Sequence, residues 1–238
     1  MTRTHRFLVV VAGATALVVT LGCGALNQAK DLVDNVATLG DFADRLGKAQ
    51  NLTYTAKYDV VGQGDDTTHV TLAQRPPQTV VRGKHGSYLV LDDGAYFCDV
   101  SEAEQTCTRS AGTDGSGLAL AAGGTFVSPE LALGLVLAAS VAPGVTVTKS
   151  EKTIAGQKSL CANVSGIEAA GDTPAGEAVR DFAVCITDDG VLASFAGTLQ
   201  NGETAKVEMT SYAAKADPKL FDLPKGAKII DVAGTPTG

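Results

Sequence analysis

The chain has 238 residues and an acidic composition, with 26 Asp and Glu against 19 Lys and Arg and a formal net charge of −7. This charge, without clusters of basic residues, argues against nucleic acid as a partner and against direct docking on anionic lipid head groups. The length fits a single domain with a sizeable core.

The first 22 residues have the pattern of a secretory signal peptide. Arg3 and Arg6 precede an apolar run of 15 residues from Phe7 to Leu21, and small residues follow. A membrane-spanning helix needs about 20 residues, so this run is too short to be one. Removal of residues 1–22 would leave 17 basic and 26 acidic residues, a net charge of −9.

Cys23 is the odd member of five cysteines and follows Thr20, Leu21 and Gly22. This stretch resembles the bacterial lipobox, in which small or apolar residues precede a lipidated cysteine. The resemblance implies cleavage before Cys23, diacylglyceryl transfer to its thiol and a membrane anchor with acyl chains such as palmitate. Residues 23–28 would then form a lipidated tether, holding an exported protein on the outer face of the bacterial cell membrane. The alternative is an ordinary secretory signal with a cysteine there by chance.

Residues 29–48 are predicted to form an amphipathic helix. Apolar residues such as Leu32, Val36, Leu39 and Phe42 recur at three- and four-residue spacing, with charged residues between them. Such a helix needs a partner surface, and packing on a sheet is the expected solution.

From Leu52 onward the apolar period changes to two, which predicts strands. The first strand places Tyr54, Ala56, Tyr58 and Val60 on one face. Further strands are expected in TTHVTLAQ, QTVVRG, SYLVLD, AYFCD, QTCTRS, VTVTKSEKTI, KSLCANVSG, RDFAVCIT, VLASFAGTL and AKVEMTSYA. The sequence Asp-Asp-Gly occurs at 92–94 and 188–190, and Asp-Gly favours a hairpin because glycine adopts positive φ freely. Strands in meander order with inserted helices predict an α+β fold on a large, curved antiparallel sheet.

The remaining four cysteines are predicted to form structural disulfides, since an exported chain folds in an oxidising compartment. Three pairings exist, and sequence alone does not select one. The local layout favours Cys98 with Cys107 across a hairpin, and Cys161 with Cys185 between two strand-like runs. No CxxC spacing is present, so no zinc site is expected.

A second helix is predicted over Ser128–Ala142. Ser128 and Pro129 have the character of an N-cap and a first helical residue, and Pro143-Gly144 ends the segment. The stretch from Leu131 to Val141 contains no charge, so this helix must be buried on most sides or must cover something apolar.

The sequence contains no nucleophile elbow, P-loop, HExxH or dinucleotide-binding motif. No catalytic residue, metal site or cofactor is therefore predicted, and the chain is not expected to be an enzyme. A hydrolase or metal enzyme would need His69 and His85 close together with a carboxylate.

Three short motifs lie at matching places along the chain, namely Tyr54-Thr-Ala-Lys-Tyr58, Leu72-Ala-Gln-Arg-Pro-Pro77 and Phe221-Asp-Leu-Pro-Lys-Gly-Ala227. With them, the chain resembles the LolA/LppX/LprG-type family of exported lipid and lipoprotein carriers, of which the sensor RseB is a more distant relative. The resemblance covers most of residues 28–232. It implies one LolA-like domain over 29–232, with 233–238 as a flexible tail.

The resemblance further implies a half-barrel, with the N-terminal helix and other helices covering the concave face around an apolar cavity. The expected ligand-binding residues are Tyr58, Val60, Phe126, Leu131, Leu135 and Val136. The leading hypothesis is a membrane-anchored, non-enzymatic lipoprotein that binds acyl chains or a lipidated ligand, such as a lipoprotein, beneath the apolar helix. The alternative is an envelope sensor or protein-interaction lipoprotein with the same sheet and no open cavity.

Overall fold

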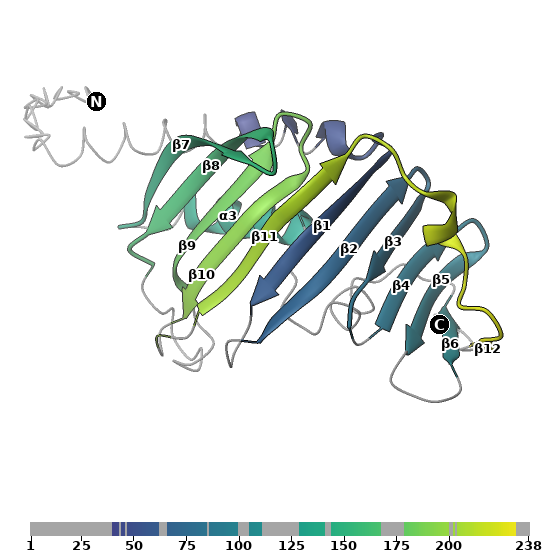
Figure 1. The fold of residues 1–238 in the computed structure, drawn as a ribbon. Coiled ribbons are helices and arrows are strands. Elements are labelled where there is room, and N and C mark those ends of the chain that lie inside the picture. Colours follow the sequence, from purple (N-terminus) through teal and green to yellow (C-terminus); the bar gives the residue numbers. More distant parts are fainter. Residues whose placement is uncertain are drawn as a thin grey trace, which may run out of the picture.

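A single sheet of twelve strands dominates the computed structural model (Figure 1). The structure describes residues 40–42, 44–45, 47–61, 66–84, 86–99, 105–110, 129–140, 144–167, 179–199, 202 and 204–231. The signal peptide, Cys23, the start of the predicted N-terminal helix, His85 and Phe126 lie outside these ranges.

The strands follow two meanders that meet in the middle of the sheet. Their bounds are β1 Tyr54–Val61, β2 Thr67–Arg75, β3 Gln78–Arg82, β4 Gly86–Leu91, β5 Gly94–Asp99, β6 Thr106–Ser110, β7 Thr146–Ile154, β8 Gln157–Ser165, β9 Val179–Thr187, β10 Leu192–Leu199, β11 Thr204–Ala213 and β12 Lys228–Asp231. The order across the sheet is β12-β6-β5-β4-β3-β2-β1-β11-β10-β9-β8-β7. All pairs are antiparallel except β12 with β6. The predicted α+β class with a large curved sheet is confirmed.

Strand alternation divides the sheet into two faces, as the two-residue apolar period predicted. One row of paired residues runs through Ala162, Val184, Phe195, Val207 and Val60, on five neighbouring strands, and every member is buried. We call the face that carries this row the inner face. The helix α3 (Pro129–Ser140) lies on this side, behind the sheet in Figure 1.

The described helical residues between 40 and 49 also close the inner face. Phe42 is buried in the same core as the row above. The amide of Gln74 donates to the carbonyl oxygens of Ala49 and Leu52, at 2.6 and 3.1 Å, and so joins the end of this helix to β2. At the β7 edge of the sheet, the Lys149 ammonium lies 2.8 Å from the Asp41 carboxylate and lowers the pKa of Asp41.

The opposite, outer face has its own smaller core at the β3–β6 end. It is covered by the segment after β11, which contains the 3₁₀ helix η1 (Pro218–Phe221) and runs to the far edge of the sheet as β12 (Figure 1). The Phe221 ring lies 4.6 Å from the Arg75 guanidinium, and Arg82 donates to the carbonyl oxygens of Leu220 and Asp222. Burial lowers the pKa of Arg82.

The two Asp-Asp-Gly sequences do not form the same turn. Between β9 and β10, Gly190 has φ +85° and its N–H donates to the carbonyl of Thr187, as expected for a turn glycine. Between β4 and β5 the turn consists of Asp92 and Asp93, and Gly94 is already the first residue of β5. Gly94 pairs with Leu91, the last residue of β4, and so begins the ladder between the two strands.

Both disulfides join directly opposed residues of neighbouring antiparallel strands. Cys98 on β5 bonds to Cys107 on β6, and Cys161 on β8 bonds to Cys185 on β9. All four side chains are buried. This is the pairing that the local layout favoured.

Candidate functional site

His69, the histidine that the described ranges include after the signal sequence, lies at an exposed position and not in a catalytic arrangement. His69 lies on β2 with its side chain 82% exposed, and its Nδ1 is 2.8 Å from Asp59 Oδ1 on the neighbouring strand. Over the described ranges, no three His, Cys, Asp or Glu side chains come close enough together to hold a metal ion. His85, the second histidine that an enzyme site would need, lies outside those ranges.

Three of the predicted ligand-binding residues meet in the inner core. Tyr58, Val60 and Val136 have side chains 1% exposed or less. Leu135 is partly buried and packs against the same core. Phe126 and the side chain of Leu131 are outside the described part of the chain. Tyr58, Val60, Val136 and Leu135 therefore belong to one apolar core, to which both the sheet and α3 contribute.

Tyr58 is the polar member of this apolar layer. Its hydroxyl donates to the carbonyl oxygen of Leu192 at 3.0 Å, which joins β1 to the start of β10 across the inner face. Complete burial raises the pKa of Tyr58 well above its usual value of 10.0, because the phenolate would be desolvated.

The helix α3 contacts the sheet through a narrow stripe of small side chains. Ala132, Val136 and Ala139 are buried, at spacings of four and three residues, which places them on one side of the helix. Gly134 and Ala138 are exposed, and Leu137 is 45% exposed. The helix thus presents apolar residues on both its buried and its exposed sides, as its uncharged sequence suggested. Its main contacts in the sheet are with β7 and β8.

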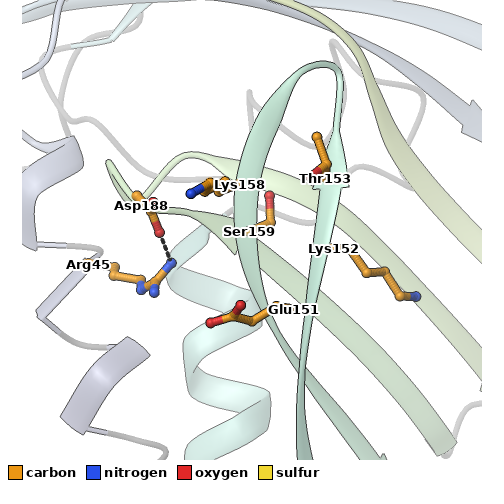
Figure 2. Close-up of a pocket in the computed structure, with 7 residues that line it drawn as sticks. All are labelled: Arg45, Glu151, Lys152, Thr153, Lys158, Ser159 and Asp188. Carbon is orange, nitrogen blue, oxygen red and sulfur yellow. Dashed lines mark hydrogen bonds and ion pairs between the residues drawn. The ribbon is translucent and has the colours of Figure 1, made fainter.

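Beside α3, a polar pocket of about 480 Å³ opens between three segments that are distant in sequence. It is lined by Arg45 from the N-terminal helical segment, by Asp188 from the β9–β10 turn, and by Glu151, Lys152, Thr153, Lys158 and Ser159 from β7 and β8. Figure 2 shows Arg45, Glu151 and Asp188 facing one another, with Lys158 beside Asp188 and Lys152 turned away.

Local structure holds each wall of this pocket in place. The β7–β8 hairpin turns through Ala155 and Gly156, both at positive φ, and pairs along its whole length. Arg45 forms an ion pair with Asp188 at 2.6 Å, and the backbone N–H of Asp188 donates to the carbonyl of Lys158. The pocket is therefore built by the fold rather than by one flexible loop.

No pattern in the sequence predicts this pocket. Its charged residues come from three segments, and each by itself has the pattern of an ordinary solvated surface position. No spacing rule connects Arg45 to Asp188, which are 143 residues apart. Only the closure of the second meander onto the N-terminal helical segment brings these residues together.

A second, shallower pocket of about 410 Å³ crosses β8–β11. Ala183 and Ala196 are neighbours there, with Asn163 and Lys206 next in the same row across the strands. This row lies on the outer face, because it alternates with buried inner-face residues such as Phe182. The lining also includes the neighbouring inner-face row of Val164, Phe182, Gly197 and Ala205, so residues of both faces contribute to this pocket.

No protein-family model matches the sequence, and no curated protein matches it. Solved structures do match. MucB shares 10% identity at a TM-score of 0.50, over 82% of this chain and 66% of the MucB chain. An uncharacterised conserved protein from Thermus thermophilus shares 8% identity at a TM-score of 0.48, over 81% of this chain and 98% of that one.

A LolA superfamily protein, NE2245 from Nitrosomonas europaea, also matches, with 8% identity, a TM-score of 0.30 and coverage of 76% of this chain and 97% of that one. At such identities the likeness concerns the fold alone. The likeness to MucB, together with the observed open curved sheet, supports the large curved-sheet fold that the sequence predicted. Within the described ranges, no helix has both the length and the apolar character needed to cross a membrane.

Proposed function

We propose that this chain is a non-enzymatic, exported lipoprotein that binds an acyl chain or a lipidated ligand between α3 and the inner face of its sheet. The observation that supports this proposal most is the narrow attachment of α3. The helix buries only Ala132, Val136 and Ala139 fully among its described side chains, whereas the sheet beneath is a continuous apolar surface across at least five strands. The helix would act as a lid.

For a lipid that enters from water, the expected transfer free energies favour displacement of such a lid. Exposing two alanines and one valine costs about 3–5 kcal/mol, at roughly 0.8 kcal/mol per buried methyl or methylene and 1.5–3 kcal/mol for a valine. A 16-carbon chain taken fully out of water contributes about 12 kcal/mol at the same rate per methylene. The described structure, with Tyr58 and Val60 covered, would then be the closed form of the protein.

The proposed anchor is the lipidated Cys23, after removal of residues 1–22. Two acyl chains retain a protein at a membrane where one alone is marginal. The two buried disulfides fit an oxidising, exported location. The domain would then project from the membrane surface on residues 23–28.

The proposal is tested by native mass spectrometry of the full-length protein after gentle extraction. We expect co-purified lipid on the wild type. Leu135→Glu places a carboxylate where α3 meets the core, so lipid should be lost while circular dichroism and the unfolding midpoint show a folded sheet. Ala138→Glu is the matched control, since it adds the same charge to the exposed side of the same helix, and it should retain lipid.

Absence of lipid from the wild type, together with global unfolding of Leu135→Glu, would contradict the carrier proposal. That pair of results would indicate that α3 is a permanent part of the core.

An envelope sensor or protein-interaction lipoprotein is the second candidate, and the fold likeness to MucB favours it, since a structure of MucB in complex with MucA(peri) exists. In this chain, the outer-face row with Ala183 and Ala196 would be the contact surface. Crosslinking in cells separates the two functions. A stable protein partner at Lys206 would favour the interaction module, and crosslinks to lipid would favour the carrier.

A further inference from the structure

We propose that the polar pocket beside α3 binds an anionic, phosphate-type group, and that in the bound ligand this group belongs to the lipid headgroup. The inference rests on the proposed carrier function and adds a headgroup class to it. The pocket volume of about 480 Å³ falls within the range of small-molecule sites.

The charge around the pocket is opposite to that of the whole chain. The net charge of the protein is −7. Around Asp188, in contrast, lie the Arg45 guanidinium at 2.6 Å, the Lys48 ammonium at 3.4 Å from the Asp188 carbonyl oxygen, and Lys158, which reaches toward Asp188 in Figure 2. Arg45 and Lys158 therefore lie at this end of the pocket, with Lys48 next to it, and Glu151 lies across from them.

One of these cations is not neutralised by an ion pair among the described residues. Arg45 and Asp188 form an ion pair, but Lys158 has no ion pair with any carboxylate of the described residues. The guanidinium fork of Arg45 and a free ammonium nearby are the groups that proteins use to hold phosphate oxygens. The overall acidity of the chain disfavours docking on an anionic surface, but it does not prevent one anionic group from entering a local basic pocket.

The position of the pocket matches an amphiphilic ligand. The pocket lies next to α3 and is built on the same two strands, β7 and β8, that α3 contacts (Figure 2). An acyl chain beneath α3 would leave the apolar layer close to Arg45 and Lys158. One ligand can therefore fill both the apolar layer and the polar pocket.

The test is a competition between two lipids with identical acyl chains, phosphatidylglycerol and diacylglycerol, of which only the first has a phosphate. Full-length protein is exchanged with both in detergent, and bound lipids are counted by native mass spectrometry. We expect the wild type to prefer phosphatidylglycerol. Lys158→Gln should lower this preference about five- to tenfold, and added salt should lower it as well.

Two further variants make the test specific. Glu151→Gln removes the carboxylate that opposes the anion, and it should raise the preference. Lys57→Gln is the matched control, because Lys57 is an exposed lysine on the outer face of β1, and it should leave the preference unchanged. Equal binding of both lipids by the wild type, or equal preferences in the wild type and Lys158→Gln, would overturn the inference while the carrier function stands.

A further experiment, with a soluble phosphate ester, applies if the carrier function itself is wrong. If the wild type binds neither lipid, glycerol 3-phosphate binding is followed by phosphorus NMR. Binding that Lys158→Gln weakens would support a phosphate site whose source is a soluble ester rather than a lipid. No binding of glycerol 3-phosphate in that case would overturn the phosphate site as well.

Discussion

At the scale of single residues, Tyr58 shows how one polar atom is accommodated within the apolar inner face. Its ring is buried between the strands and the helices, and its hydroxyl finds the Leu192 carbonyl oxygen at 3.0 Å. The alternation of the first strand predicted the inward orientation of Tyr58. The partner could not be predicted, because Leu192 is 134 residues away along the chain.

Tyr58→Phe should therefore destabilise the fold without changing its shape. The variant removes one buried hydrogen bond and leaves the Leu192 carbonyl without that donor, so a loss of about 1–3 kcal/mol in the free energy of unfolding is expected. Urea unfolding at pH 8 measures it. A change below a few tenths of a kcal/mol would show that this hydrogen bond does not matter.

The same variant gives a pH prediction. Because burial raises the pKa of Tyr58 above 10.0, the folded chain keeps this proton at a pH where the unfolded chain has lost it. The stability from this group is complete below pH 10 and decreases as the pH rises further. The difference in the free energy of unfolding between wild type and Tyr58→Phe should therefore become smaller above pH 10, by at most about 1.4 kcal/mol per pH unit. A gap that stays constant from pH 8 to 11 would contradict the raised pKa.

At the scale of elements, local sequence signals predicted most of the structure. Every strand from β1 to β11 falls in a segment that the sequence predicts to be a strand, and α3 lies between the predicted proline signals. β12 was missed because its four residues are all exposed and show no alternation. Its pairing with β6 brings Ile229 opposite Cys107, a contact across distant parts of the chain.

The two disulfides should contribute unequally to stability. They close chain segments with sequence separations of 9 and 24 residues. Loop-closure entropy then gives about 2.7 kcal/mol for Cys98–Cys107 and about 3.5 kcal/mol for Cys161–Cys185. Urea unfolding of the two double Cys→Ala variants measures this. A larger loss for the Cys98 and Cys107 pair would show that packing around the sulfur atoms, rather than loop closure, sets the order.

At the scale of the whole molecule, the sequence predicted the α+β class and the curved sheet, but not the polar pocket. Fold class follows from patterns within single segments, which the sequence displays directly. The pocket depends on the meeting of Arg45, Lys158 and Asp188 once the second meander has closed onto the N-terminal helical segment. The proposed membrane location depends on neither, since it comes from the N-terminal sequence alone.

Cys23→Ser should release the protein from membranes without unfolding it, because the lipid anchor is proposed to lie outside the folded domain. Fractionation of cells into membrane and soluble parts measures the location, and circular dichroism of the released protein checks the fold. Continued retention in the membrane fraction would contradict the anchor at Cys23.

A lipid that α3 covers must lie against both the helix and the inner face of the sheet. Photo-crosslinking of the full-length protein with a diazirine-bearing fatty acyl chain, followed by peptide mapping, tests this placement. We expect labels on residues 129–140 of α3 and on inner-face positions such as Tyr58, Phe195 and Val207, and none on Ala196 of the outer face. Labels confined to the outer face, or an absence of saturable labelling, would contradict it.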